Sequence, residues 1–311
     1  MKKYLHTQIA ESSIALPSVV IVSFVVWIIN GVADMWWLQC SLMAATIYAI
    51  VELNNSNVLI RVRSRMTSSV FLLYTSTYPA FFTSIRYTFV VLCLTLFLLL
   101  LFHSYQDKTS VRLLYYSHIL LGIASLFYVQ ILLFIPLFWL LALTNIQSLT
   151  FRTWMASLLG ILTPYWLLLP LLLYRRDISI AEQHFQPLFH YGNAFNFSLF
   201  TAGQLFTAII VWTLGTVGAI HFLRFNYEDR IRTRQLFGFF AWTTIFATFL
   251  LFLQPDSFDP LMRIIILSLS TFTAHYFSLT RTRLAFIIFI AGVIAITLAI
   301  IFNLASPMAW K

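Results

Sequence analysis

The lysine and arginine residues of this chain divide very unequally between alternate loops of a series of apolar segments. Apolar runs of roughly twenty residues, the length that crosses a bilayer, recur from about Ile14 to Asn303. If each run is a helix and the N-terminus is cytoplasmic, fourteen basic residues lie inside and five lie outside. The inside residues are Lys2, Lys3, Arg61, Arg63, Arg65, Lys108, Arg112, Arg152, Arg224, Arg230, Arg232, Arg234, Arg281 and Arg283, and the outside residues are Arg86, Arg175, Arg176, Arg263 and Lys311. The positive-inside rule then predicts an all-α, polytopic transmembrane helical bundle of about eleven spans, N-in and C-out, in a bacterial inner (cytoplasmic) membrane.

Composition agrees with this class. The 311 residues are 60% hydrophobic and only 9% charged, whereas soluble domains carry about 25% charged residues. Eleven spans of about 20 residues use about 220 positions, so we expect residues 1–311 to form a single integral membrane domain. The net charge of +9 sits at span ends, where insertion bias and anionic head groups explain it. Membrane lipids are therefore expected partners, and nucleic acid is not.

The apolar segments predict where the helices lie. We expect spans at 14–33, 35–52, 66–84, 87–104, 153–174, 199–222, 235–254, 261–279 and 284–303, and two short helices within 113–143 that turn near 128–130. Pro164 and Pro170 predict kinks in the span that contains them. Gly203, Gly215 and Gly218 predict close contact with another helix, because a missing side chain lets backbones approach.

No cofactor and no metal site are predicted. Cys40 and Cys93 fall inside predicted spans, where they support neither a disulfide nor a metal site. Four histidines fall near the cytoplasmic ends of their spans: His103, His118, His221 and His275. Haem or metal ligation is one interpretation of them. An interfacial position with the polar tip in water is the interpretation we prefer.

The predicted outer loop 175–198 is the strongest candidate for a site. Arg175 and Arg176 oppose the charge bias, and guanidinium groups bind phosphate in a bidentate manner. Apolar residues within the loop favour a short re-entrant or interfacial helix, and its histidines and Glu182 are candidate acid–base groups. The alternative is that the arginine pair only caps its span and pairs with Asp177. The predicted ligand-binding residues are Arg86, Arg175, Arg176, Glu182, His184, His190 and Arg263; catalytic residues are unassigned.

Residues 74–174 resemble part of the multi-pass GT-C glycosyltransferases. The likeness lies in Tyr78-Pro79 through Arg86, in 121–128 (LGIASLFY) and in 160–165 (GILTPY). The resemblance implies a polyprenyl-phosphate-linked sugar as ligand at the outer face and acidic residues as base or metal ligands. This chain departs from the family because Asp34 is expected in a tight turn rather than in a large catalytic first outer loop. The acidic residue that the family usually carries after the second outer connection is also missing beyond Arg86. The same stretch resembles uncharacterised bacterial inner-membrane proteins of this architecture.

Three functions remain open from the sequence. The first is an envelope-biogenesis protein that binds or processes a polyprenyl-phosphate-linked glycan precursor, and whether it is an enzyme stays undecided. The second is a non-catalytic scaffold or partner subunit that assembles with other envelope proteins. The third is a small-solute transporter, against which we count the scarcity of ionisable groups in mid-span.

Overall fold

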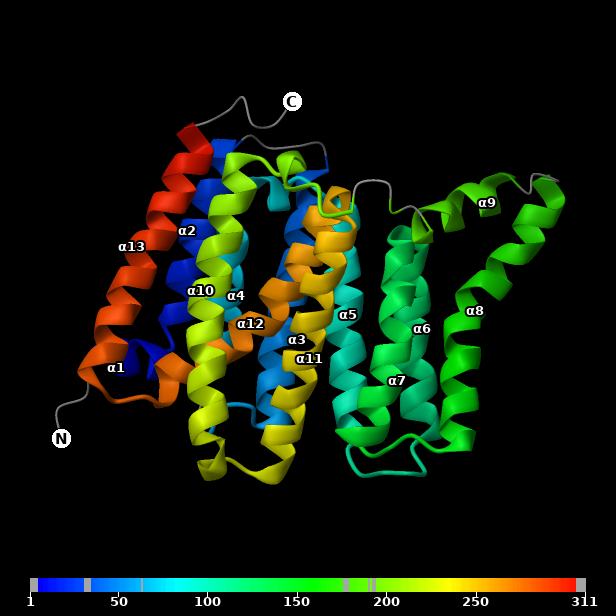
Figure 1. Ribbon diagram of the computed structural model, residues 1–311, viewed down its shortest axis with the longest axis horizontal. Coiled ribbons are helices and arrows are strands. Elements are labelled where there is room, and N and C mark those ends of the chain that lie inside the picture. The colour runs from blue at the N-terminus through cyan, green and yellow to red at the C-terminus, as the bar shows by residue number, and fades with distance from the viewer. Residues whose placement is uncertain are drawn as a thin grey trace.

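The computed structural model describes residues 5–30, 35–62, 64–175, 179–189, 191 and 194–305. Across these ranges every regular element is helical and no strand occurs (Figure 1). The α-helices are α1 (Leu5–Glu11), α2 (Ala15–Asn30), α3 (Trp36–Asn57), α4 (Met66–Ser76), α5 (Ile85–His103), α6 (Val111–Phe127), α7 (Ile135–Thr144), α8 (Phe151–Arg175), α9 (Ser179–Phe185), α10 (Ala202–Phe225), α11 (Ile231–Leu253), α12 (Phe258–Leu279) and α13 (Arg283–Ala305). The short 3-10 segments are η1 (Pro79–Phe82), η2 (Val129–Phe134), η3 (Gln186–Leu188), η4 (Phe197–Leu199), η5 (Asn226–Glu228) and η6 (Pro255–Ser257).

Six helical segments in the described ranges are long and apolar enough to cross a membrane. They lie in α3, α5, α8, α10, α11 and α13. Shorter apolar helical segments are 15–30, 111–127 and 129–144. Length and composition therefore support a multi-pass helical membrane protein, because every backbone polar group inside a helix is paired without help from water.

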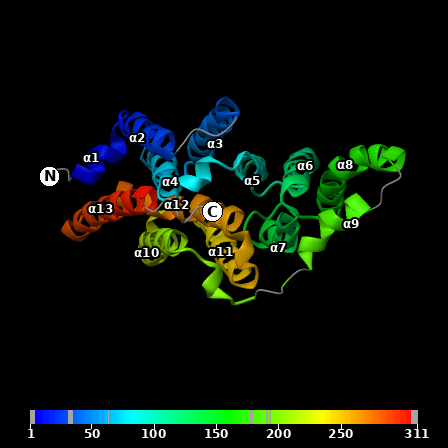
Figure 2. The same ribbon diagram turned by 90° about the horizontal axis from the view of Figure 1, so that it is seen from above.

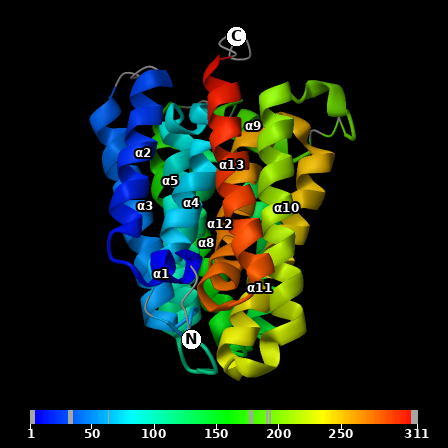
Figure 3. The ribbon, with the colours of Figure 1, turned by 90° about the vertical axis from the view of Figure 1, so that its left-hand side faces the viewer.

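Most of the long helices run side by side along one direction (Figures 1 and 3). One end of the bundle carries α9, η4 and η6, and we call it the α9 end. The opposite end carries η5 and the turns that precede α4, α6, α8 and α13. Seen from above, α12 lies between α4 on one side and α10 and α11 on the other (Figure 2).

Helix α12 is the centre of the fold. Nearly all of its residues are buried, including the whole run from Pro260 to Ser278. A helix that is apolar around its full circumference is stable only where other helices enclose it. Ser270, Thr271 and Thr273 donate their hydroxyl hydrogen bonds to carbonyl oxygens of the same helix, as Thr271 does to the Ser268 carbonyl at 2.7 Å. Small side chains and satisfied hydroxyls thus allow neighbouring helices to approach closely.

The three glycines of α10 lie against other helices, which confirms the sequence prediction. A Cβ added at Gly218 would lie 2.7 Å from the backbone carbonyl of Phe272 in α12, and one at Gly215 would lie 2.7 Å from the Leu269 side chain. A Cβ at Gly203 would collide with the amide of Asn303 in α13. The glycine face of α10 therefore sets the spacing between α10, α12 and α13.

Helix α8 packs tightly on α6 over its first half and then leaves it. A Cβ at Gly160 would lie 2.5 Å from the Tyr115 carbonyl, and one at Gly122 would lie 2.6 Å from the Ile161 carbonyl. The later part of the helix leans away from the bundle (Figure 1), and both internal prolines, Pro164 and Pro170, lie in its second half. A proline inside a helix removes a hydrogen bond and clashes with the preceding turn, so it bends the axis. Trp166 and Leu167 are consequently strongly exposed.

Some helix boundaries agree with the predictions made from the sequence, and others differ from them. The stretch 113–143 does form two short helical pieces that turn at Tyr128, and the loop after α8 does contain a short helix, α9. The expected span 66–84 is wrong in detail, because α4 ends at Ser76 and η1 follows. Tyr78 has an extended backbone, as expected for the residue before a proline. Helix α1 was not expected.

Candidate functional site

A polar cavity of about 260 Å³ opens at the α9 end of the bundle. Its walls come from the start of α5, the junction of α6 with η2, the α9–η3 segment and η6. The lining residues are Arg86, Tyr87, Tyr128, Val129, Gln130, Gln183, His184, Pro187 and Ser257. Segments more than 150 positions apart in the sequence, such as Arg86 and Ser257, therefore meet around one cavity.

Arg86 supplies the positive charge of this cavity. It is the second residue of α5, and its Nε donates a hydrogen bond to the carbonyl oxygen of Phe127, the last residue of α6. Its guanidinium also lies 5.7 Å from the ring centre of Tyr87. The side chain nevertheless remains exposed. Arg86 is thus held in place by Nε, while its exposed side chain lines the cavity.

His184 reaches the cavity from α9. Its Nε2 lies 3.5 Å from the hydroxyl of Tyr165 in α8, and that hydroxyl lies 2.6 Å from Ser125 Oγ in α6. The ring of Phe185 stacks on Tyr165 with the centroids 5.6 Å apart. These contacts attach α9 to α8, and through Tyr165 to α6. Burial, and then the nearby charge of Arg86, lower the pKa of His184 from its ordinary value, so the imidazole is neutral at pH 7.

The seven residues predicted from the sequence are not all in one place. Arg86 and His184 line the cavity together, whereas Glu182 is exposed on α9 and is not among the lining residues. Arg175 ends α8, but its side chain lies outside the described part of the structure, as do Arg176, His190 and the turn residue Asp34. Whether the arginine pair shares this cavity therefore stays a prediction.

Arg263 has a different environment from Arg86. Its side chain is 3% exposed and forms an ion pair with Asp259 one helical turn earlier in α12. Nη1 donates to Thr88 Oγ1 at 2.8 Å, and Nη2 donates to the Phe81 carbonyl at 2.6 Å. The guanidinium also lies 5.0 Å from the Phe81 ring centre. Arg263 thus joins α12 to α5 and η1, and its hydrogen bonds are used within the protein rather than offered to a ligand.

A second polar cluster lies at the opposite end of the bundle, and it was not predicted from the sequence. His275 Nε2 in α12 lies 3.0 Å from Asp229 Oδ2, and both side chains are buried. Arg61 Nε lies 2.9 Å from the other carboxylate oxygen of Asp229. From the sequence, His275 was interpreted as an interfacial residue, and Asp229 had no predicted role. The feature that could have indicated this cluster is the pair of adjacent acidic residues, Glu228 and Asp229, in a loop that otherwise carries arginines.

Within the described residues, no group of three or more His, Cys, Asp or Glu side chains is arranged to hold a metal ion. Comparison with known proteins finds no matching family model, no matching curated protein and no matching solved structure.

Proposed function

We propose that this protein binds the anionic head group of a membrane lipid in the cavity around Arg86, with a polyprenyl-phosphate-linked glycan precursor as the ligand class. The observation that carries the proposal is the exposed guanidinium of Arg86 in a cavity otherwise lined by neutral hydrogen-bonding groups. Gln130, Gln183 and Ser257 offer donors to phosphate oxygens. A guanidinium binds phosphate with directed, charge-assisted hydrogen bonds.

The position of Arg86 supports an anion as the occupant. It lies in the first turn of α5, where the partial positive charge of the helix N-terminus already disfavours a cation. A phosphate at this point would interact favourably with both the helix end and the guanidinium. The unfavourable electrostatic energy of a cation at this helix end is then offset when a phosphate is bound.

The neighbouring surface supports a lipid rather than a free phosphate. After Pro164, α8 exposes Trp166, Leu167 and Leu169. Helix α9 lies next to the end of α8 (Figure 1). A lipid-attached phosphate needs a charged site for its head group and apolar surface for its chain. The resemblance of residues 74–174 to GT-C glycosyltransferases implies the same ligand class.

The proposal is binding rather than sugar transfer. GT-C chemistry needs a carboxylate as base or metal ligand, and the described residues that line the cavity include neither aspartate nor glutamate. Glu182 is the nearest in sequence, on α9, but it is exposed. We therefore propose a non-catalytic protein of envelope biogenesis that holds or presents the precursor.

We further propose that the chain crosses a bacterial inner membrane eleven times with the α9 end outside. The distribution of lysine and arginine supports this orientation. The count adds α4 with η1, the three shorter apolar segments and the enclosed helix α12 to the six long apolar segments. Helix α12 contacts other helices rather than lipid, so it does not need the hydropathy of a lipid-facing span.

The experiment is binding of undecaprenyl phosphate to the purified protein, measured by native mass spectrometry from detergent. We expect Arg86→Ala to weaken binding about 10- to 100-fold, because charge-assisted hydrogen bonds of about 1.5–3 kcal/mol are lost. Arg86→Lys is expected to weaken it less, since charge remains but the planar fork does not. The matched control is Arg112→Ala, which removes an exposed arginine at the opposite end. Equal affinity of Arg86→Ala and wild type would refute the proposal.

A further inference from the structure

A second polar cavity, of about 290 Å³, lies on the flank of the bundle towards the end opposite the α9 end. Its walls come from the turn between α1 and α2, from the last two turns of α3 and from the segment that precedes α4. The polar residues that line it are Glu11, Ser12, Ser13, Asn55, Ser64 and Arg65. It therefore offers a cation, a carboxylate and neutral hydrogen-bonding groups to one ligand, and we call it the Arg65 cavity.

The guanidinium of Arg65 is available to a ligand. Arg65 is the N-cap residue of α4, and its exposed side chain forms no hydrogen bond or ion pair within the described residues. Its backbone carbonyl, in contrast, accepts from Ser68 Oγ at 2.8 Å and from Ser69 Oγ at 3.0 Å. The partial positive charge of a helix N-terminus disfavours a cation and favours an anion. A phosphate in this cavity would therefore interact favourably with both the helix end and the guanidinium.

The walls of the Arg65 cavity are joined by hydrogen bonds of other groups. Ser64 Oγ donates to the Ala10 carbonyl at 2.6 Å, which attaches the segment before α4 to α1. Asn54 Nδ2 donates to the Ser64 carbonyl at 3.0 Å, which attaches the same segment to α3. Asn54 and Ser64 are buried, whereas Ser13 and Asn55 are exposed and their side chains form no hydrogen bond within the described residues. The cavity is therefore pre-formed, and its exposed donors remain for a ligand.

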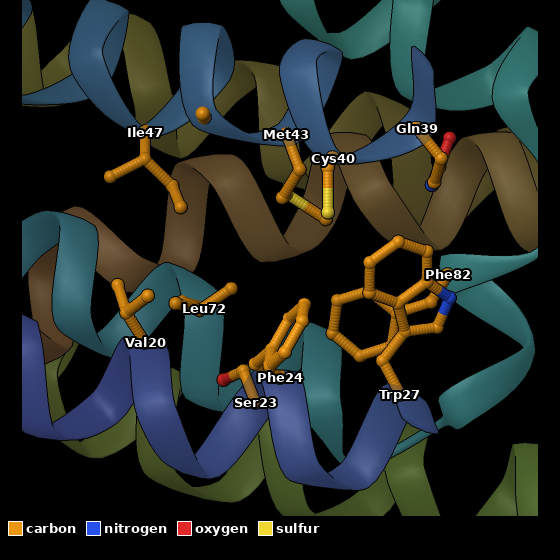
Figure 4. Close-up of a pocket in the computed structure, with 11 residues that line it drawn as sticks. Val20, Ser23, Phe24, Trp27, Gln39, Cys40, Met43, Ile47, Leu72 and Phe82 are labelled. Carbon is orange, nitrogen blue, oxygen red and sulfur yellow. The ribbon is translucent and has the colours of Figure 1, made fainter. Parts of the chain in front are cut away.

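An apolar cavity lies between α2 and α3 on the same flank (Figure 4). Its volume is about 230 Å³, and Val20 and Phe24 of α2 are substantially exposed at its side. Figure 4 shows Val20 and Ile47 together at one end of it. Ile47 lies four residues before Val51, which lines the Arg65 cavity, and this spacing is about 6 Å along the helix. The two cavities therefore follow each other along α3.

We propose that this flank binds one phospholipid with a phosphoethanolamine head group, which occupies the Arg65 cavity while one acyl chain occupies the apolar cavity. The Arg65 guanidinium donates to the phosphate, and the Glu11 carboxylate accepts from the ammonium. Glu11 already makes an interaction in the protein, and a carboxylate with two oxygens accepts more than one donor. A phosphoglycerol head group has no cation for Glu11, and a phosphocholine head group has no N–H to donate.

The length of the site matches one leaflet of a membrane. Val51 and Met43, which lines the apolar cavity, are eight residues apart on α3, about 12 Å along the helix axis. One leaflet contributes about half of a hydrocarbon core of roughly 30 Å. An acyl chain that begins beside Val51 therefore ends within the apolar cavity. None of the residues that line these two cavities lines the cavity around Arg86, so this proposal and the proposed function can fail independently.

Native mass spectrometry of the purified full-length protein measures the affinity. The probes are phosphatidylethanolamine, phosphatidylglycerol and phosphatidylcholine with the same palmitoyl and oleoyl chains, and glycerophosphoethanolamine, which has no chains. We expect phosphatidylethanolamine to bind about tenfold more tightly than the other two lipids, because about one charge-assisted hydrogen bond separates them. Glycerophosphoethanolamine is expected not to bind. Equal affinities for the three lipids, no binding of phosphatidylethanolamine, or equally tight binding of glycerophosphoethanolamine would overturn the proposal.

Variants of the two charged residues test the head-group contacts. Arg65→Gln is expected to weaken phosphatidylethanolamine about 10- to 100-fold, whereas the control Arg281→Gln, at an exposed arginine of the same end, is expected to change nothing. Glu11→Gln is expected to abolish the preference over phosphatidylglycerol. Because Glu11 and Arg65 are both exposed, we expect both variants to fold. An unchanged affinity in Arg65→Gln, or a preserved preference in Glu11→Gln, would overturn the proposal.

A cavity-filling variant tests the acyl chain. Ala44 of α3 lines the apolar cavity, and Ala44→Phe is expected to weaken all three lipids more than about tenfold, because the chain loses its apolar contact surface. Affinities equal to those of the wild type would overturn the assignment of the chain to this cavity. Binding of undecaprenyl phosphate, measured in parallel, should be unchanged in Arg65→Gln, and an equal loss of both ligands would contradict two separate sites.

Discussion

The imidazole of His275, near the end of the central helix α12, lies 3.0 Å from a carboxylate oxygen of Asp229 in the loop that follows α10. Both side chains are buried, and Arg61 approaches the second carboxylate oxygen from the segment between α3 and α4. One carboxylate therefore connects the loop after α10 and the segment between α3 and α4 to helix α12, which packs against α4, α10 and α11. A buried carboxylate is tolerated because both of its oxygens face donors.

We expect Asp229→Ala to lower the free energy of unfolding by about 3 kcal/mol, because it leaves the buried His275 without its acceptor and removes the partner of Arg61 Nε. Thermal unfolding in detergent, followed by tryptophan fluorescence, measures the change. Glu228→Ala is the control, since Glu228 pairs with the same Arg61 at 3.0 Å but is half exposed, and exposed pairs contribute about 0–1 kcal/mol. Equal losses in the two variants would contradict a special role for the buried carboxylate.

The α10 glycines should differ in their tolerance of alanine. Gly218→Ala places a methyl group against backbone atoms of Phe272, which cannot move aside without shifting α12. Gly215→Ala meets only side-chain atoms of Leu269, its Cβ included, and Gly292→Ala in α13 meets the Leu214 side chain of α10 at a milder 3.2 Å. We expect folded yield in detergent to fall in the order Gly292, Gly215, Gly218, with overpacking costs of about 1–3 kcal/mol at the last. A Gly218→Ala protein as stable as wild type would show that α10 and α12 separate easily.

Binding of a phosphate lipid should strengthen as the pH falls. Burial and the charge of Arg86 lower the pKa of His184 from 6.5, so this side chain is neutral at pH 7 and gains its proton only below pH 6.5. A bound phosphate favours the protonated form, hence the complex takes up a proton and affinity rises as the pH is lowered. Titrations from pH 7.5 to pH 5 should show a steeper rise in wild type than in His184→Gln, because titration of the lipid phosphate is common to both. Parallel curves would remove His184 from the binding cavity.

Membrane topology can be tested with reporter fusions. We expect a reporter after Arg65, Lys108 or Arg234 to be cytoplasmic, and one within 182–192 to be external, because arginine in mid-membrane costs about 2.5–3.5 kcal/mol. Alkaline phosphatase and green fluorescent protein fusions report opposite sides. An external location for residues 230–234 would overturn both the orientation and the assignment of the α9 end to the outer face.

The helical class and most helix positions could be predicted because they depend on local properties. A segment of about twenty apolar residues has to satisfy its own backbone in lipid, and only a helix does so within one segment. The bend of α8 likewise follows from the prolines inside the helix. The close helix contacts at Gly203, Gly215 and Gly218 follow from the missing side chains. Even the short α9 was evident from apolar residues between charged ones in a loop.

The environments of the charged residues were decided by the tertiary structure. Arg86 and Arg263 look alike in sequence, since each follows a predicted turn at the start of a helix. The structure encloses Arg263 with Asp259, Thr88 and the Phe81 carbonyl, and leaves Arg86 exposed beside His184. Hydropathy and the charge bias place an arginine at a depth in the membrane, but its partners come from other helices whose packing depends on contacts distant in the sequence. For the same reason Trp27 and Gln39, ordinary span residues in the sequence, share one cavity only because α2 and α3 pack on α4.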